Sequence, residues 1–227
     1  MEHDNMLAVL KLLKNADKAV GATYLSERTG IPPATVGRIL SSLENKKIIE
    51  KDSNKGRILT DYGKKYLEDL IVKKESIKIA DQFADIVQDV SKKRLLEIIQ
   101  LRVLIESEGA RMAAANCTDE NARILEGILM DYAYELRHNQ MGDKSDLALH
   151  TYIAKLSGSE TLHKIVRLLL QKNDAFVKFS AANRLASQKI LHHKELVEAI
   201  IAHDGVAAEQ KMRRHLLEVM NDVEKFY

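Results

Sequence analysis

The histidines of this chain are concentrated in its C-terminal part. Seven of the eight lie between positions 138 and 215. Asp146 and His150 are spaced by four residues, so on a helix their side chains project from the same face, one turn apart. His193 and His215 each share a helical face with apolar residues, which directs both imidazoles into a helical core. These four side chains are therefore predicted to converge.

Three imidazoles and a carboxylate are a suitable ligand set for a divalent cation. Nitrogen and carboxylate oxygen donors suit Zn²⁺, and also Ni²⁺ or Mn²⁺, and leave coordination positions for water or a ligand. The sequence thus predicts a metal site formed by Asp146, His150, His193 and His215, with Zn²⁺ as the first choice. The alternative is that these histidines are hydrogen-bonded residues of a hydrophobic core.

The remaining late histidines and the single cysteine are expected to have structural positions. His192 is rotated by about 100° from His193, toward Lys189 and Glu195, and points away from the predicted core. Three others are predicted to lie on the surface or at helix ends: His138, His163 and His203. Cys117 is predicted to be a small packed residue rather than a reactive thiol.

A second group of polar residues lies on a predicted helix over residues 33–45. The apolar residues of this helix follow the i, i+3, i+4, i+7 spacing of a buried face: Val36, Ile39, Leu40 and Leu43. The opposite face carries Thr35, Arg38, Ser41, Ser42 and Asn45. A DNA major groove admits such a helix, where arginine can contact guanine and hydroxyl groups can contact bases or phosphates.

The segment after this helix predicts a β-hairpin wing. Residues 47–51 and 57–59 are short β-branched runs that flank a polar loop. Lys55 and Arg57, on either side of Gly56, are suited to phosphate or minor-groove contacts. The predicted DNA contacts are Pro33, Thr35, Arg38, Ser41, Ser42, Lys55 and Arg57. Residues 1–75 carry 14 Lys/Arg and 11 Asp/Glu, a net charge of +3, whereas the rest of the chain has a net charge of −1. The positive charge therefore lies in the predicted DNA-binding head.

Helix and strand signals divide the chain into three parts. Residues 1–70 predict a winged helix-turn-helix, in which one helix ends at Gly30, the next begins at Pro33, and Thr60 caps the helix after the hairpin. Residues 71–92 predict an amphipathic helical connector. Residues 93–227 predict an all-helical bundle, with helices near 93–116, 119–138, 143–157, 160–183, 186–203 and 205–225. The expected fold class is mainly α, with one small hairpin.

The composition agrees with a helical, soluble protein of one or two domains. The chain has 227 residues, of which 45% are hydrophobic, and its two prolines are adjacent, Pro32 and Pro33. No apolar run approaches the ~20 residues that span a bilayer, and the acidic N-terminus does not resemble a secretory signal. A single cysteine cannot form an intramolecular disulfide, which suits a reducing compartment. A cytoplasmic location without membrane attachment is therefore expected.

Several C-terminal segments resemble one known family. The segments 146–159, 193–200, 204–208 and 212–216 are similar to the FCD ligand-binding domain of FadR-type GntR regulators, and the 22-residue separation of His193 and His215 is part of the match. The segment Leu101–Glu106, with alanines at 110, 113 and 114, resembles the opening helix of that domain. Together the matches span about residues 93–222.

The resemblance implies an all-helical bundle in which Asp146, His150, His193 and His215 bind a divalent metal. It also implies a cavity for a small carboxylate-bearing metabolite, whose acid group contacts the metal and an arginine that matches Arg102. Such a position for an anion is physically reasonable, because the cation and the guanidinium both supply charge-assisted contacts in a site that excludes water.

The N-terminal part departs from that family. The proline-glycine turn and the arginine-bearing recognition helix of the usual GntR head have no match here. Residues 25–49 look more like the winged heads of IclR-like, MarR-like and archaeal regulators. The helical connector is also unusual for the family.

Together these patterns predict a homodimeric transcription factor, in the first place a repressor, that binds operator DNA through paired winged heads. Its helical domain is expected to sense a small organic acid through the bound metal, without enzymatic activity. Two alternatives stay open. One is a metal-dependent hydrolase, in which the metal activates water, and the other is a regulator that responds to the metal alone.

Overall fold

The fold of the chain is mainly helical, with one small antiparallel sheet, as predicted. The computed structural model describes residues 2–16, 18–52, 56–138, 140, 142–170 and 186–226. The chain divides into two compact units, Met1–Asp81 and Gln82–Tyr227, which are described separately below. In the described part of the chain, no helix has the length and apolar character needed to cross a bilayer.

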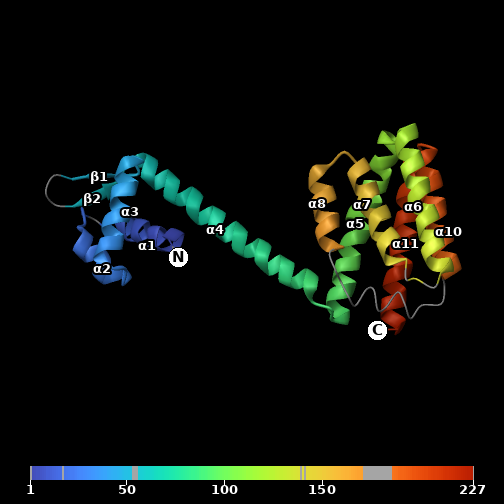
Figure 1. Ribbon diagram of the computed structural model, residues 1–227, viewed down its shortest axis with the longest axis horizontal. Helices are drawn as coiled ribbons and strands as arrows, with labels where there is room; N and C mark the ends of the chain where they lie inside the picture. The colour runs from blue at the N-terminus through green and yellow to red at the C-terminus, as the bar shows by residue number, and fades with distance from the viewer. Residues whose placement is uncertain are drawn as a thin grey trace. The chain divides into compact units, whose positions relative to one another are not determined.

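The N-terminal unit is a winged helix-turn-helix (Figure 1). Its elements are α1 (Glu2–Asn15), α2 (Ala22–Thr29), α3 (Pro33–Asn45), β1 (Ile49–Lys51), β2 (Arg57–Leu59) and the first part of α4 (Asp61–Gln88). α2 ends at Gly30, whose φ of 69° is a left-handed conformation that glycine adopts without steric cost. α3 begins at Pro33, where the missing N–H has no intrahelical partner to lose. The predicted turn between the two helices is therefore confirmed.

The hydrophobic core of this unit fixes the orientation of α3. The predicted buried face of α3 is confirmed, because Val36, Ile39, Leu40 and Leu43 are all less than 9% exposed. They pack with buried residues of the neighbouring helices, among them Leu10, Leu25 and Leu67. Since one face of α3 is held in this core, the opposite face of the helix is left at the surface.

The wing is a two-stranded hairpin. β1 and β2 are antiparallel, with Ile49 opposite Leu59 and Lys51 opposite Arg57. A further bridge joins Val20 to Arg57 on the other side of β2. The Thr60 hydroxyl accepts a hydrogen bond from the Gly63 N–H at 2.9 Å and caps the start of α4, as predicted.

The region predicted as a connector contains the end of one helix and the start of another. α4 ends at Gln88, and the side chain of Ser91 caps α5 (Lys92–Asn116). The boundary between the two compact units, after Asp81, lies within α4. Residues 71–92 are therefore divided between the units.

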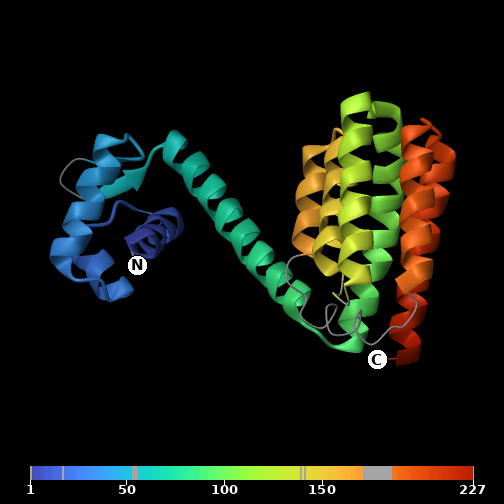
Figure 2. The ribbon, with the colours of Figure 1, turned by 45° about the vertical axis from the view of Figure 1, so that its right-hand side comes forward.

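The C-terminal unit is a helical bundle (Figures 1 and 2). After α5 it contains α6 (Asp119–Arg137), α7 (Asp143–Leu156), α8 (Glu160–Leu169), α10 (Ala186–Ile201) and α11 (Gly205–Phe226). α5 contacts α7, α8, α10 and α11, and it is buried on several faces. The predicted helix over 160–183 is wrong in its length, because α8 ends at Leu169 and the Leu170 N–H bonds to the carbonyl of Val166 as its cap. Residues 171–183 lie outside the described residues.

Candidate metal centre

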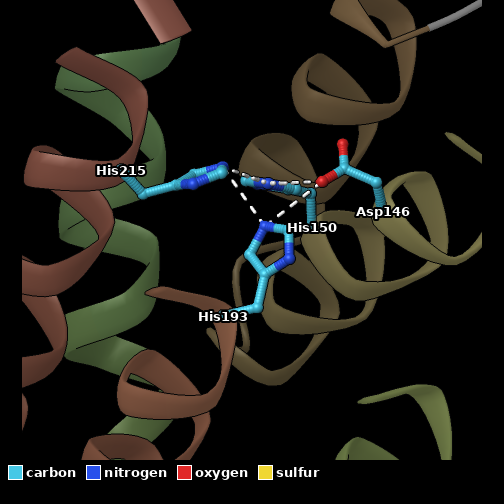
Figure 3. Close-up of side chains that lie close together, drawn as sticks. All are labelled: Asp146, His150, His193 and His215. Atoms are coloured by element: carbon cyan, nitrogen blue, oxygen red, sulfur yellow. Dashed lines mark hydrogen bonds and ion pairs between the residues drawn. The ribbon is translucent and has the colours of Figure 1, made fainter. Parts of the chain in front are cut away.

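Three helices bring the predicted metal ligands together. α7 carries Asp146 and His150 on one face, α10 carries His193, and α11 carries His215. One potential ligand atom of each residue lies within 4.8 Å of those of the other three. The side chains converge on a common point in Figure 3. The helical phases inferred from the sequence are therefore the phases that the bundle adopts.

The cluster is held by short contacts between ligand atoms. Nε2 of His215 lies 3.2 Å from Nε2 of His150 and 3.3 Å from Nε2 of His193. Oδ1 of Asp146 lies 3.2 Å from Nε2 of His193 and 3.8 Å from Nε2 of His150. One proton on the His215 nitrogen can serve only one of its two imidazole neighbours, whereas a cation at the common point attracts all the lone pairs. The donor set therefore fits a divalent metal.

The four ligands differ in their contact with solvent. His150, His193 and His215 are at most 4% exposed, whereas the Asp146 side chain is 32% exposed. Asp146 is therefore the cluster residue with the most contact with solvent.

The protonation of the cluster favours cation binding. Burial lowers the pKa of His193 and lowers that of His215 strongly, so both imidazoles are neutral at pH 7 and keep a lone pair for a metal. Burial alone would raise the pKa of Asp146, but the neighbouring His150 and His193 outweigh this effect and lower it. The site therefore combines two neutral imidazoles, those of His193 and His215, with an ionised carboxylate.

A buried carboxylate on α5 contacts one residue of the cluster. Glu106 on α5 is 2% exposed, and its Oε2 lies 2.5 Å from Nδ1 of His150. Since an ionised carboxylate only accepts, Nδ1 of His150 carries the proton of this hydrogen bond, and Nε2 is the ring atom that faces the other ligands. This contact fixes both the ring orientation and the tautomer of one ligand.

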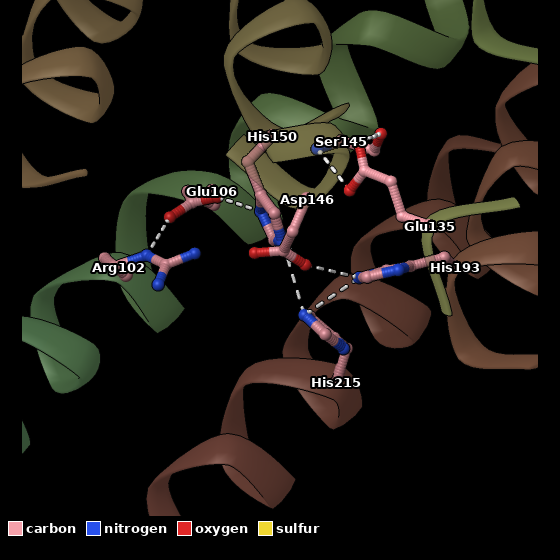
Figure 4. Close-up of polar contacts among 8 residues, drawn as sticks. All are labelled: Arg102, Glu106, Glu135, Ser145, Asp146, His150, His193 and His215. Atoms are coloured by element: carbon pink, nitrogen blue, oxygen red, sulfur yellow. Dashed lines mark hydrogen bonds and ion pairs between the residues drawn. The ribbon is translucent and has the colours of Figure 1, made fainter. Parts of the chain in front are cut away.

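The predicted effector contact, Arg102, belongs to the same network. Arg102 is 2% exposed, and its Nε donates to Oε1 of Glu106 at 2.5 Å. Burial raises the pKa of Glu106, but the charge of Arg102 and the contact with His150 outweigh it and lower the pKa to about 2. In Figure 4 the guanidinium extends toward the cluster, and its charge contributes to the low pKa of His215.

The role of Glu106 was not predicted from the sequence. A usable signal was present, because Arg102 and Glu106 are four residues apart on a helical face that otherwise carries residues such as Val103 and Ala110. Two opposite charges on a buried face must pair with each other or with a third polar group. The identity of that third group, His150, depends on a contact with another helix.

Comparison with known proteins identifies the family. A model of the FCD domain matches residues 97–218. This chain is a GntR-family regulator with an FCD domain. The IclR helix-turn-helix domain matches residues 4–53, which confirms the atypical head.

Two curated relatives are transcriptional regulators. The HTH-type transcriptional regulator LutR of Bacillus subtilis is 24% identical over 222 residues, which cover 91% of each chain. The HTH-type transcriptional repressor NanR of an Enterobacter species is 31% identical over 120 residues, which cover 52% of this chain and 46% of NanR. These relatives support a DNA-binding transcriptional regulator of the GntR/FCD type.

Solved structures of GntR regulators have the same fold. Escherichia coli McbR/YncC has a TM-score of 0.55 at 13% identity, and the match covers 99% of this chain and 95% of that one. A GntR protein of Streptococcus agalactiae has a TM-score of 0.50 at 21% identity, over 97% of this chain and 100% of that one.

The IclR-type head presents the predicted residues of α3 at its surface. Pro33, Arg38, Ser41, Ser42 and Asn45 are exposed, and Thr35 is half-buried. Nη2 of Arg38 lies 3.4 Å from the Thr35 hydroxyl. The face opposite the core of α3 is thus polar and accessible, as a helix that enters a DNA groove requires.

One of the predicted wing contacts, Arg57, has an acidic partner in the structure. Nε of Arg57 donates to Oε1 of Glu44 at 2.7 Å, and both side chains are about one-quarter exposed. This ion pair links the wing to α3, and the role of Arg57 as a phosphate contact stays a prediction. Lys55, the other predicted wing contact, lies outside the described residues.

The other histidines of the FCD domain and Cys117 lie outside the cluster. His192 is half-buried, and its Nδ1 lies 2.9 Å from Oε2 of Glu218. His138 caps α6, and His203 follows α10, with its Nδ1 2.9 Å from the carbonyl oxygen of Ala114. His163 is half-buried on α8, and Cys117 is buried at the end of α5.

Acid is expected to destabilise the metal-free protein in a defined pH window. The unfolded state binds protons at His193 and His215 near pH 6.5, whereas the folded state does not, so the free energy of unfolding falls as pH falls below 6.5. Each histidine contributes up to about 1.4 kcal/mol per pH unit. We expect a loss of about 1–3 kcal/mol between pH 7.5 and 5.5, measured by urea denaturation with a chelator present. In His215→Gln the free energy of unfolding should fall less steeply with falling pH than in the wild-type protein. An equal slope would mean that His215 does not contribute to this pH dependence.

Proposed function

We propose that this regulator senses a small carboxylate-bearing effector through a divalent metal held by Asp146, His150, His193 and His215. Effector binding would change the affinity of paired winged heads for operator DNA in a homodimer. The convergence of three buried imidazoles with one partly exposed carboxylate carries the proposal. Zn²⁺ is the first choice of metal, and Ni²⁺ and Mn²⁺ are the alternatives.

The chemistry of the site suits an anionic effector. A bound cation supplies positive charge and open coordination positions for a carboxylate. Arg102 adds a guanidinium charge near the cluster, and Asp146 is the cluster residue with the most contact with solvent. Since Glu106 already bonds to Arg102, an effector carboxylate has to share the guanidinium with Glu106 or replace it.

A dimer follows from the size of one head. A single recognition helix contacts few base pairs, and two heads read half-sites that are about one helical turn or a multiple of it apart. An effector changes operator affinity only when it binds more tightly to one arrangement of the heads than to the other. The relative NanR is named a transcriptional repressor, which favours repression as the mode of action of this chain.

A DNA-shift experiment tests the proposal. The full-length protein is loaded with Zn²⁺ and bound to an operator that it has selected from random duplexes, and small carboxylates are then added. A carboxylate that alters the shift and is recovered unchanged supports the sensor. If Zn²⁺ alone produces the full change in DNA binding, the protein is a metal-responsive regulator and the proposed effector sensor is wrong. If the carboxylate is converted to another compound, the protein is a metal-dependent hydrolase instead.

Arg38→Ala tests the DNA-binding face. Loss of an arginine that contacts a base is expected to weaken operator binding by about 1–3 kcal/mol, while binding to non-specific DNA weakens less. Fluorescence anisotropy with both DNAs at fixed salt measures the two affinities. Arg28→Ala on α2 removes the same charge from another exposed position of the head and should affect both DNAs equally. Unchanged operator affinity in Arg38→Ala would assign base reading to other residues.

A further inference from the structure

Helix α6 supplies none of the four cluster residues, yet it contacts two of the helices that do. Tyr132 on α6 is 4% exposed, and its ring meets the His193 ring edge to face, with the centroids 4.8 Å apart. The same ring also lies against Gly142, the residue that precedes α7. A Cβ added at Gly142 would lie 2.7 Å from Cε2 of Tyr132. The Tyr132 ring therefore fills the space between α10 and the start of α7.

Gly142 determines where α7 begins. Its φ of 73° is a left-handed conformation that favours glycine, and its carbonyl oxygen accepts the Asp146 N–H at 2.9 Å. Asp146 thus lies one helical turn from the contact with Tyr132. Any displacement of the Gly142 backbone is passed to Asp146 through this hydrogen bond.

A second contact from α6 holds the same turn of α7. The Ser145 hydroxyl donates to Oε1 of Glu135 at 2.7 Å, and the Ser145 N–H points to Oε2 at 3.4 Å (Figure 4). A carboxylate at a helix N-terminus is also favoured by the helix dipole. α6 therefore fixes the first turn of α7 at two points.

We propose that Tyr132 is a positioning residue for the metal cluster, because its ring sets the separation between Asp146 on α7 and His193 on α10. The inference rests on the proposed metal site. Oδ1 of Asp146 and Nε2 of His193 are 3.2 Å apart. Asp146 is the ligand with the least burial, so its position depends most on the helix start that Tyr132 supports.

The ring of Tyr132 acts by its shape rather than as a ligand. Atoms of the ring, rather than the hydroxyl, make the contacts with His193 and Gly142. Tyr132→Phe keeps the ring and is therefore expected to behave like the wild-type protein. Tyr132→Leu removes the ring and releases both Gly142 and His193.

Cobalt binding tests the proposal in the full-length protein. Co²⁺ is titrated in competition with a chelator, and its visible absorption spectrum reports the ligand geometry. Tyr132→Leu is expected to lower Co²⁺ affinity by about 10- to 100-fold, the usual effect of losing a residue that supports a ligand, and to alter the spectrum. Tyr132→Phe should restore both. Leu125→Ala is the matched control, because it makes a cavity at a fully buried site of the same helix.

A second variant acts from the other side of the contact. Gly142→Ala places a Cβ against the Tyr132 ring, so it should change the Co²⁺ spectrum while the ring is still present. If Tyr132→Leu matches Leu125→Ala in affinity and spectrum, or if Gly142→Ala leaves the spectrum unchanged, the positioning role is overturned and the metal site stands. Failure of the wild-type protein to bind Co²⁺ would overturn both the metal site and the role of Tyr132.

Discussion

His193→Ala is expected to lower Zn²⁺ affinity by more than about 100-fold, beyond the effect of losing a residue that only supports a ligand. The variant removes the nitrogen that lies 3.2 Å from Asp146 and 3.3 Å from His215. It leaves three donors and a cavity at a position that is fully buried. Competition with a chromophoric chelator measures the affinity, and elemental analysis of the purified protein measures occupancy.

His192→Ala is the matched control for this prediction. It changes the adjacent residue on the same helix, but His192 contacts Glu218 instead of the cluster. Its Zn²⁺ affinity should equal that of the wild-type protein. An equal loss in both variants would mean that the zinc is bound elsewhere, and the proposed ligand set would then be wrong.

Glu106→Ala is expected to lower the free energy of unfolding of the FCD domain by about 3–5 kcal/mol, because it removes one partner of a buried ion pair. The Arg102 and Glu106 side chains are 3% and 2% exposed, so the variant leaves a buried guanidinium without this carboxylate. The loss is a large part of the 5–15 kcal/mol that is usual for a domain. Denaturant unfolding in the presence of a chelator measures it without a contribution from bound metal.

The same variant should also weaken metal binding. Without Glu106 the His150 ring loses the contact that fixes its tautomer and orientation, so Zn²⁺ affinity is expected to fall by about 10- to 100-fold. Glu108→Ala provides the control on the same helix, because the pair of Glu108 with Arg111 is 48% exposed on both sides. Glu108→Ala should lower the free energy of unfolding by less than about 1 kcal/mol and leave Zn²⁺ affinity unchanged. If Glu106→Ala and Glu108→Ala had similar effects on stability and Zn²⁺ affinity, Glu106 would have no supporting role at the metal site.

The residues of the cluster were predictable because helical phase is a local property. The four-residue spacing of Asp146 and His150 places both on one face of α7 whatever surrounds that helix. The apolar neighbours of His193 and His215 direct those side chains inward for the same reason. The head was predictable from Gly30 and Pro33, because each residue favours a backbone conformation that the turn between α2 and α3 requires.

Other features depended on contacts between segments that are distant in the sequence. The sequence marks Arg57 as a basic wing residue, but its pairing with Glu44 follows from the packing of the hairpin on α3. The apolar periodicity of the sequence likewise continues past Leu169, so it does not indicate that α8 ends there. Propensity and spacing describe one helix or strand at a time, so they do not indicate which charge on a neighbouring element is within reach.

The sequence by itself thus determined most of the elements, their buried faces and the four candidate ligands of this regulator. The tertiary structure alone decided what surrounds those ligands. Glu106 lies 44 positions before His150 in the chain, and Tyr132 and His193 come from different helices. The physical reason is that a buried polar or aromatic side chain is fixed by the partners that packing brings to it, and helix packing is set by the whole core rather than by local spacing.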